Sequence, residues 1–136
     1  MKKITLLLAL ATSLHGQAQK TDLKSSMERG LDVYTGQCMT CHMATGEGLP
    51  TVYPSLVKNK NVPNKAYLAQ SIVKGQRGAI NGQTWSGEMP PMALTDEQVA
   101  DVMNYVRNNF GNKAPLVLRK DVQPSLKVAV KGFQAY

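Results

Sequence analysis

The chain has 136 residues, a length that predicts one domain and excludes a protein built from two catalytic domains. It has only two cysteines and two histidines, which excludes a disulfide-stapled scaffold and a zinc site with four protein Cys and His ligands. The formal net charge is +7, but basic and aromatic residues are not interleaved and no nucleic-acid-binding motif is present, so we expect no nucleic-acid partner.

The N-terminus has the pattern of a secretory signal peptide. Lys2 and Lys3 precede a mostly apolar stretch over residues 4–14, and Gly16 and Ala18 provide the small residues of a cleavage site. The apolar stretch is shorter than the ~20 residues that a membrane-spanning helix needs. We therefore expect residues 1–18 to be removed on export. The mature protein would then have no transmembrane anchor and would lie in the periplasm or otherwise outside the cytoplasm.

The first helix is predicted over residues 26–37. Met27, Leu31 and Tyr34 recur there at helical spacing and give the helix one apolar face, so we interpret Met27 as core. The helix leads directly into the pair of cysteines. Residues 46–61 follow without a sustained period and are interrupted by glycine and proline, which predicts a structured loop.

The second helix is predicted over residues 64–74. It stops at Gly75, a residue type that suits the left-handed end of a helix. A loop rich in glycine and proline then extends over residues 76–94. A loop of this length in a small domain is usually functional or wrapped around something. We expect few strands anywhere in the chain.

The third helix begins with a capping box, in which Thr95 precedes Gln98 by three residues. Apolar residues then recur at helical spacing as far as Phe110, and Gly111 is predicted to end the helix. Met103 lies on this apolar stripe and is interpreted as a core residue.

Residues 113–136 form a basic C-terminal extension with five basic side chains and one acidic one. Their apolar residues predict no particular element. We therefore divide the chain into a signal peptide (1–18), one domain (19–112) and this extension (113–136). The extension would either dock a partner or pad the fold.

The chemistry of the chain is concentrated in the run Cys38-Met39-Thr40-Cys41-His42. Cys-x-x-Cys-His is the attachment motif of c-type haem, in which two thiols bond to the haem vinyl groups and the histidine ligates the iron. A thioredoxin-like redox pair would need a preceding strand, whereas a helix is predicted here. Zinc would lack a fourth ligand, and a copper(I) carrier that uses the soft cysteine ligands remains an alternative.

The motif belongs to a longer series that resembles the class I, mono-haem cytochromes c of the bacterial periplasm. The resemblance covers about residues 30–111. It consists of the first helix with its haem motif, Gly46-x-Gly48 with Pro54-x-Leu56, Asn81-Gly82-Gln83-Thr84-Trp85 with Met89-Pro90-Pro91, and the last helix from Thr95. It implies a small all-α cytochrome c fold, with about three main helices wrapped around one covalently attached haem c.

The resemblance also implies two iron ligands and one supporting group. The Pro54 carbonyl would accept a hydrogen bond from His42 and fix the orientation of its ring. Met89 would supply the sixth ligand, because the family places that methionine immediately before a proline. Met92 stays open as the alternative ligand.

Three further residues have expected roles. The indole of Trp85 would either donate to a haem propionate or be a packed aromatic. Arg77 would either pair with a propionate or be an exposed cation. Gly30 would let the first and third helices approach closely, with Tyr105 and Val106 opposite it. The haem itself would fill a core that is poor in aromatic residues, which make up 6% of the chain.

The function that the resemblance implies is one-electron transfer, without transformation of a substrate. Partners would be redox proteins such as a periplasmic dehydrogenase or a terminal oxidase. The role of cytochrome subunit in a dehydrogenase complex is compatible with this function. An open sixth position would instead indicate a haem sensor or a peroxidase-like protein. Without haem, a thiol oxidoreductase or a copper carrier that uses Cys38 and Cys41 would remain.

Overall fold

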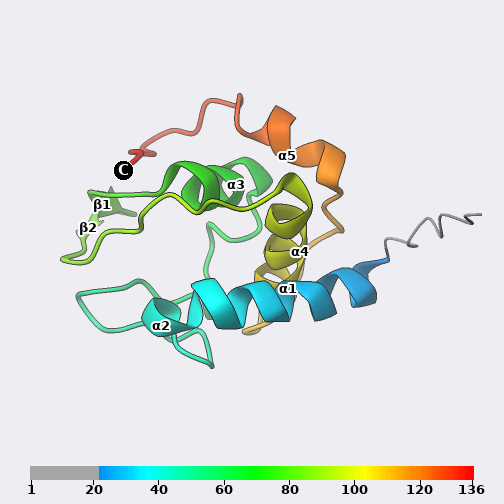
Figure 1. Cartoon of the computed structure of the whole chain (residues 1–136). Helices are drawn as coiled ribbons and strands as arrows, with labels where there is room; N and C mark the ends of the chain where they lie inside the picture. Colours follow the sequence, from blue (N-terminus) through cyan, green and yellow to red (C-terminus); the bar gives the residue numbers. More distant parts are fainter. Residues whose placement is uncertain (1–21) are drawn as a thin grey trace, which may run out of the picture.

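The computed structural model describes residues 22–136, and the predicted signal peptide lies outside this range. The described residues are mostly helical (Figure 1). The helices are α1 (Leu23–Gln37), α2 (Met39–His42), α3 (Lys65–Lys74), α4 (Asp96–Arg107) and α5 (Arg119–Ser125), and the strands are β1 (Ala79–Ile80) and β2 (Gln83–Thr84). The three longest helices, α1, α3 and α4, are the three that the sequence predicts. The all-α fold class is therefore confirmed.

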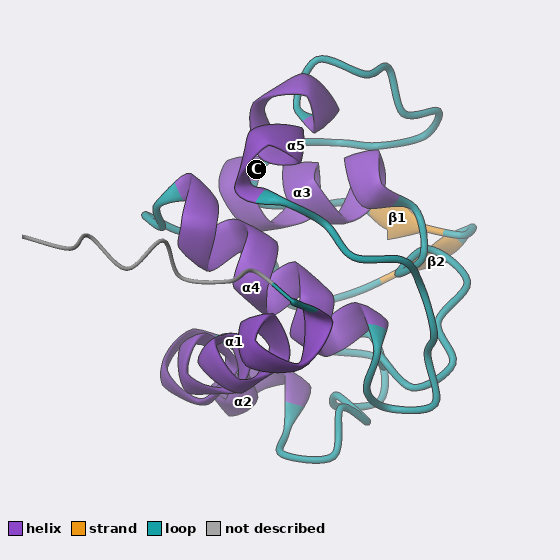
Figure 2. Ribbon diagram, turned by 90° about the vertical axis from the view of Figure 1, so that its right-hand side faces the viewer, coloured by secondary structure: helices purple, strands orange, loops and turns teal. Residues whose placement is uncertain are grey.

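The core is built around the place where α4 crosses α1 (Figures 1 and 2). A Cβ atom added to Gly30 would collide with the Asp101 carbonyl and lie 2.9 Å from the Tyr105 Cβ atom. The close approach predicted at Gly30 is therefore present. The atoms nearest to that position belong to Asp101 and to Tyr105, which was predicted there.

Helix α1 differs from its prediction at its start and on its buried face. It begins three residues earlier, because the Asp22 side chain accepts a 3.0 Å hydrogen bond from Ser25 N and caps it. Its buried residues are Ser26, Gly30 and Tyr34. Leu31, predicted on the apolar face, is 45% exposed, and Met27 is only half-buried. The buried face is thus rotated by about one residue.

A polar cluster explains this rotation and joins α1 to α4. Asp101, which is 4% exposed, accepts hydrogen bonds from Ser26 Oγ (2.5 Å), Arg29 Nε (2.7 Å) and Arg29 Nη2 (2.8 Å). Asn104 donates to Ser26 Oγ (2.8 Å) and also bonds both backbone groups of Val117 at 2.8 Å. Ser26 is therefore buried because its hydroxyl is paired, which hydrophobic periodicity cannot detect.

Helix α4 has the predicted capping box, with Thr95 and Gln98 bonded reciprocally. The apolar stripe is buried as predicted, and Met103 has no exposed surface. The predicted end at Gly111 is wrong, because the helix stops at Arg107. Phe110 lies beyond the helix with a φ of 55°, and its ring returns to the core at 5.3 Å from the Tyr34 ring.

The loop over residues 76–94 contains a short hairpin that the sequence analysis did not predict. Strands β1 and β2 pair antiparallel, with Ala79 opposite Thr84. Asn81 and Gly82 connect them with φ values of 54° and 82°. Two successive positive φ angles are typical of the tight hairpin turn that Asn-Gly favours.

The C-terminal residues pack onto the rest of the molecule (Figure 2). Val117 and Val122 are 1% and 0% exposed and belong to the hydrophobic core. Arg107 Nη1 donates to the Pro115 carbonyl at 2.8 Å, which fixes the start of this segment against α4. None of the helices within residues 22–136 has the length and apolar character needed to cross a membrane.

Candidate functional site: a haem-binding cavity

The Cys-x-x-Cys-His motif forms a single helical turn at the end of α1. Cys38 ends α1 and begins α2, and its carbonyl accepts a 2.9 Å hydrogen bond from His42 N. Met43 ends α2 with a φ of 64°, and Tyr34 Oη donates to its carbonyl at 2.7 Å. This turn brings Cys38, Cys41 and His42 to the lining of one cavity.

The imidazole of His42 is oriented by Pro54. His42 Nδ1 lies 3.2 Å from the Pro54 carbonyl oxygen, which is the contact that the resemblance implies. Because a carbonyl only accepts, Nδ1 carries the proton and Nε2 keeps its lone pair. Burial lowers the pKa of His42, and the bond to Pro54 opposes this shift less strongly. The ring is therefore held in the neutral form that ligates a metal.

Met89 is presented to the same cavity by a backbone bridge. Gln76 N donates to the Met89 carbonyl at 2.7 Å, and Met89 N donates back to the Gln76 carbonyl at 2.9 Å. Met92 lies further along, where its N donates to the Ile72 carbonyl at 2.9 Å.

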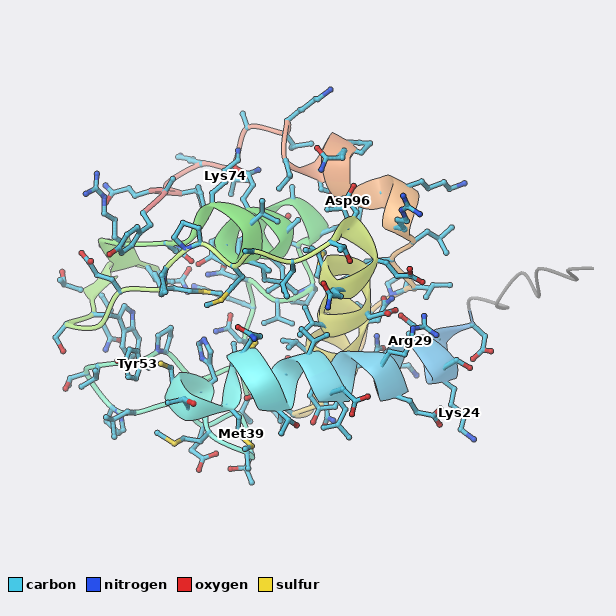
Figure 3. All side chains as sticks on the ribbon, in the orientation of Figure 1. Lys24, Arg29, Met39, Tyr53, Lys74 and Asp96 are labelled. Carbon is cyan, nitrogen blue, oxygen red and sulfur yellow. The ribbon has the colours of Figure 1, made fainter. Side chains whose placement is uncertain are left out.

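Two adjoining cavities make up the site. They share the lining residues Cys38, His42, Pro54, Gln76, Ile80 and Met89. We call the one that is walled by core residues of α3 and α4 the inner cavity and its neighbour the outer cavity. The outer one is bordered by Tyr53, which lies between α2 and the hairpin (Figure 3). Met89 lines both cavities, whereas Met92 lines only the outer one.

Trp85 and Arg77 both line the outer cavity, where they differ in exposure. The Nε1 atom of Trp85 is buried and has no hydrogen-bond partner in the part of the chain that the structure describes. Leaving a buried donor unpaired costs about 1–3 kcal/mol, so this N–H fits an acceptor supplied by a bound group, such as a carboxylate. Arg77 is exposed and provides a cation at the edge of the cavity. The two thiols, the imidazole, the thioether and this donor together fit a covalently attached haem.

Gln76 lines both cavities and was not predicted from the sequence. It is 6% exposed, and its Oε1 atom accepts hydrogen bonds from Tyr67 Oη (2.9 Å) and Ser71 Oγ (3.0 Å). These partners come from α3, and Tyr67 lines the inner cavity as well. Nothing in the local pattern around Gln76 marks it as buried. The network becomes visible only once α3 and the loop are folded together.

Cys38 does not have the environment of a redox-active thiol. Burial, with a smaller contribution from Cys41, raises its pKa to about 11. The thiolate is the nucleophilic form, and catalytic cysteines have a lowered pKa. Together with the helix before the motif, this argues against the thiol oxidoreductase alternative.

Comparison with known proteins agrees with the geometry of the site. The family model described as Cytochrome c matches residues 27–110, which is more than half of the chain. The chain belongs to the cytochrome c family. It therefore binds haem c covalently and serves electron transfer.

The relatives are of two kinds. Cytochrome c-552 of Thermus thermophilus is 30% identical over 114 residues, which cover 78% of this chain and 84% of the relative. Cytochrome c-554(548) of Halomonas halodenitrificans is 36% identical over 72 residues, or 52% of this chain and 81% of that protein. The cytochrome c subunit of the quinone alcohol dehydrogenase of Gluconacetobacter polyoxogenes is 33% identical over 93 residues, or 63% of this chain. The matched region spans only 19% of that longer subunit.

Proposed function

We propose that this cytochrome c is an exported one-electron carrier whose haem iron is ligated by His42 and Met89. The observation that carries the proposal is the convergence of His42 and Met89 on two cavities, both of which Cys38 lines and one of which Cys41 also lines. When bound, haem c supplies an iron that alternates between the ferric and ferrous states. Residues of the chain then set the stability of each state.

His42 is the ligand whose position is best supported. Its Nδ1–H group is engaged with Pro54, so the ring is held in one orientation with Nε2 available. A hydrogen bond at the other ring nitrogen also strengthens an imidazole as a metal ligand. We infer that His42 stays bound in both oxidation states.

Met89 is the better candidate for the second ligand because it lines both cavities and Met92 lines only one. A thioether is a soft ligand and favours ferrous iron, so it raises the reduction potential. The backbone bridge to Gln76 holds the Met89 segment beside α3. We infer that this bridge limits the structural change around Met89 when the iron is reduced.

We also propose where the carrier works and what it meets. The pattern of residues 1–18 favours export to the periplasm. The likeness to dehydrogenase cytochrome subunits supports a dehydrogenase as electron donor. The acceptor that the family resemblance implies is a terminal oxidase. Exposed residues at the outer cavity, Gln37, Arg77 and Glu88, would border a small, transient contact with such proteins.

The ligand assignment is tested by measuring the midpoint potential of the haem-bound protein and of two variants. Met89→Ala is expected to lower the midpoint potential by about 100 mV. This is a fraction of the ~0.8 V range over which axial ligands set the potential. Met92→Ala removes an equal thioether from the same loop and is the matched control, with an expected change several times smaller. The reverse ranking would assign the ligand to Met92.

A further inference from the structure

The segment after α5, residues 126–136, crosses α3 and ends beside the β1–β2 hairpin (Figure 1). We call it the C-terminal strap. Two side chains of α3 hold its start. Gln70 Nε2 donates to the Val128 carbonyl and Lys74 Nζ donates to the Leu126 carbonyl, both at 2.8 Å. Lys74 lies next to the strap (Figure 3). These bonds fix the path of the strap over the helix.

The far end of the strap pairs with the backbone just after α3. Arg77 N donates to the Gln134 carbonyl at 3.1 Å, and Tyr136 N donates to the Lys74 carbonyl at 3.3 Å. The ring of Phe133 packs edge-on against Tyr67, with 5.9 Å between ring centroids. The strap is therefore fastened by both backbone and aromatic contacts.

Residues 74–77 lie between the strap and the segment that carries Met89. Backbone groups of Lys74 and Arg77 form hydrogen bonds with the strap. Both backbone groups of Gln76 form hydrogen bonds with Met89. The segments meet at Gly75. A Cβ atom there would collide with the Met89 carbonyl and lie 2.7 Å from the Tyr136 Cβ atom. Residues 74–77 thus cannot shift far toward either neighbour while both are in place.

We propose that the C-terminal strap is a positioning element for the sixth iron ligand: it holds residues 74–77 in place and so slows the departure of Met89 from the iron. The inference rests on the proposed ligation by Met89. The strap acts only through the Gln76–Met89 bridge. A bond from a soft thioether to ferric iron is weak compared with the same bond to ferrous iron, so its lifetime depends on how firmly the loop is held.

The test measures how fast cyanide replaces the sixth ligand in the ferric, haem-bound protein. Tyr136→Pro removes the N–H group that bonds Lys74, and Phe133→Ala removes the contact with Tyr67. Each is expected to accelerate cyanide binding about fivefold, the effect of losing one ordinary contact. Val128→Ala is the matched control, because this strap side chain is 52% exposed. Its rate should stay within about twofold of wild type.

The outcomes separate this inference from the ligand assignment. A Met89→Ala protein serves as the reference with an open sixth position. If the wild type binds cyanide as fast as that reference, the ligation by Met89 is wrong and the strap proposal falls with it. If the wild type is slow and both strap variants are equally slow, only the strap proposal is overturned, whatever their free energies of unfolding. If one of the two strap variants fails to fold, the cyanide-binding rate of the other one decides the question.

Discussion

At the scale of single residues, the unpaired indole of Trp85 makes the sharpest prediction. Its buried N–H group has no acceptor among residues 22–136. If a haem propionate accepts it, Trp85→Phe should lower the free energy of unfolding of the haem-bound protein by about 1 kcal/mol. Denaturant unfolding of wild type and variant measures this difference.

The sign of the change in unfolding free energy on Trp85→Phe decides between the two roles of Trp85. A donor that stays unpaired in the haem-bound protein only costs desolvation energy, so its removal would be neutral or stabilising. A variant as stable as the wild type, or more stable, would therefore contradict the contact with a propionate. Trp85 would then be the packed aromatic that the sequence also allows.

Single residues also show how far the sequence alone could predict the site. Cys38, Cys41 and His42 could be predicted because covalent attachment fixes their spacing within one helical turn. Gln76 could not, because its burial depends on Tyr67, which lies nine positions earlier on another element. The rest of the site depends on tertiary contacts that leave no local pattern.

At the scale of elements, the crossing of α1 and α4 depends on Gly30. Gly30→Ala should lower the free energy of unfolding by about 1–3 kcal/mol, because the added methyl group would meet the Asp101 backbone carbonyl. Gly36→Ala is a matched control on the same helix, because its new atom would have no other described residue within 4 Å outside the local helix backbone. It should be neutral or stabilise by up to about 1 kcal/mol.

Thermal or denaturant unfolding of the two haem-bound variants tests this pair. Similar free energies of unfolding for Gly30→Ala and Gly36→Ala would mean that α1 and α4 can move apart at Gly30 without loss of stability. A Gly30→Ala protein that unfolds earlier while Gly36→Ala does not would locate the constraint at the crossing itself.

The helices also show which features hydrophobic periodicity can and cannot find. It predicted α3 and the start of α4 because caps and apolar spacing agree there. It misplaced the buried face of α1, where Ser26 is paired with Asp101. It also extended α4 too far, because Phe110 reaches the core from a turn and happens to continue the helical spacing. Apolar spacing reports that a side chain is buried but not which backbone carries it there.

At the scale of the whole molecule, the core is incomplete without its cofactor. The two cavities lie between α2, the hairpin loop and the apolar faces of α3 and α4. Apolar faces with nothing to pack against are costly in a small protein, since stability falls with every cavity. The haem therefore completes the core as well as carrying the electron.

This gives a prediction for the haem-free chain. A Cys38→Ser/Cys41→Ser double variant without attached haem should have little of the helical circular dichroism of the haem-bound protein. It should also show no cooperative unfolding on heating. A helical haem-free chain with a sharp unfolding transition would show that the protein core is sufficient by itself.

The central claim is that a methionine closes the sixth coordination position of an electron carrier. The most direct measurement is the visible spectrum of the ferrous, haem-bound wild type before and after exposure to carbon monoxide. We predict an unchanged spectrum in the wild type and a rapid change in Met89→Ala, because only the variant leaves a position open. Rapid binding of carbon monoxide by the wild type would contradict the account and indicate a haem sensor or peroxidase-like protein instead.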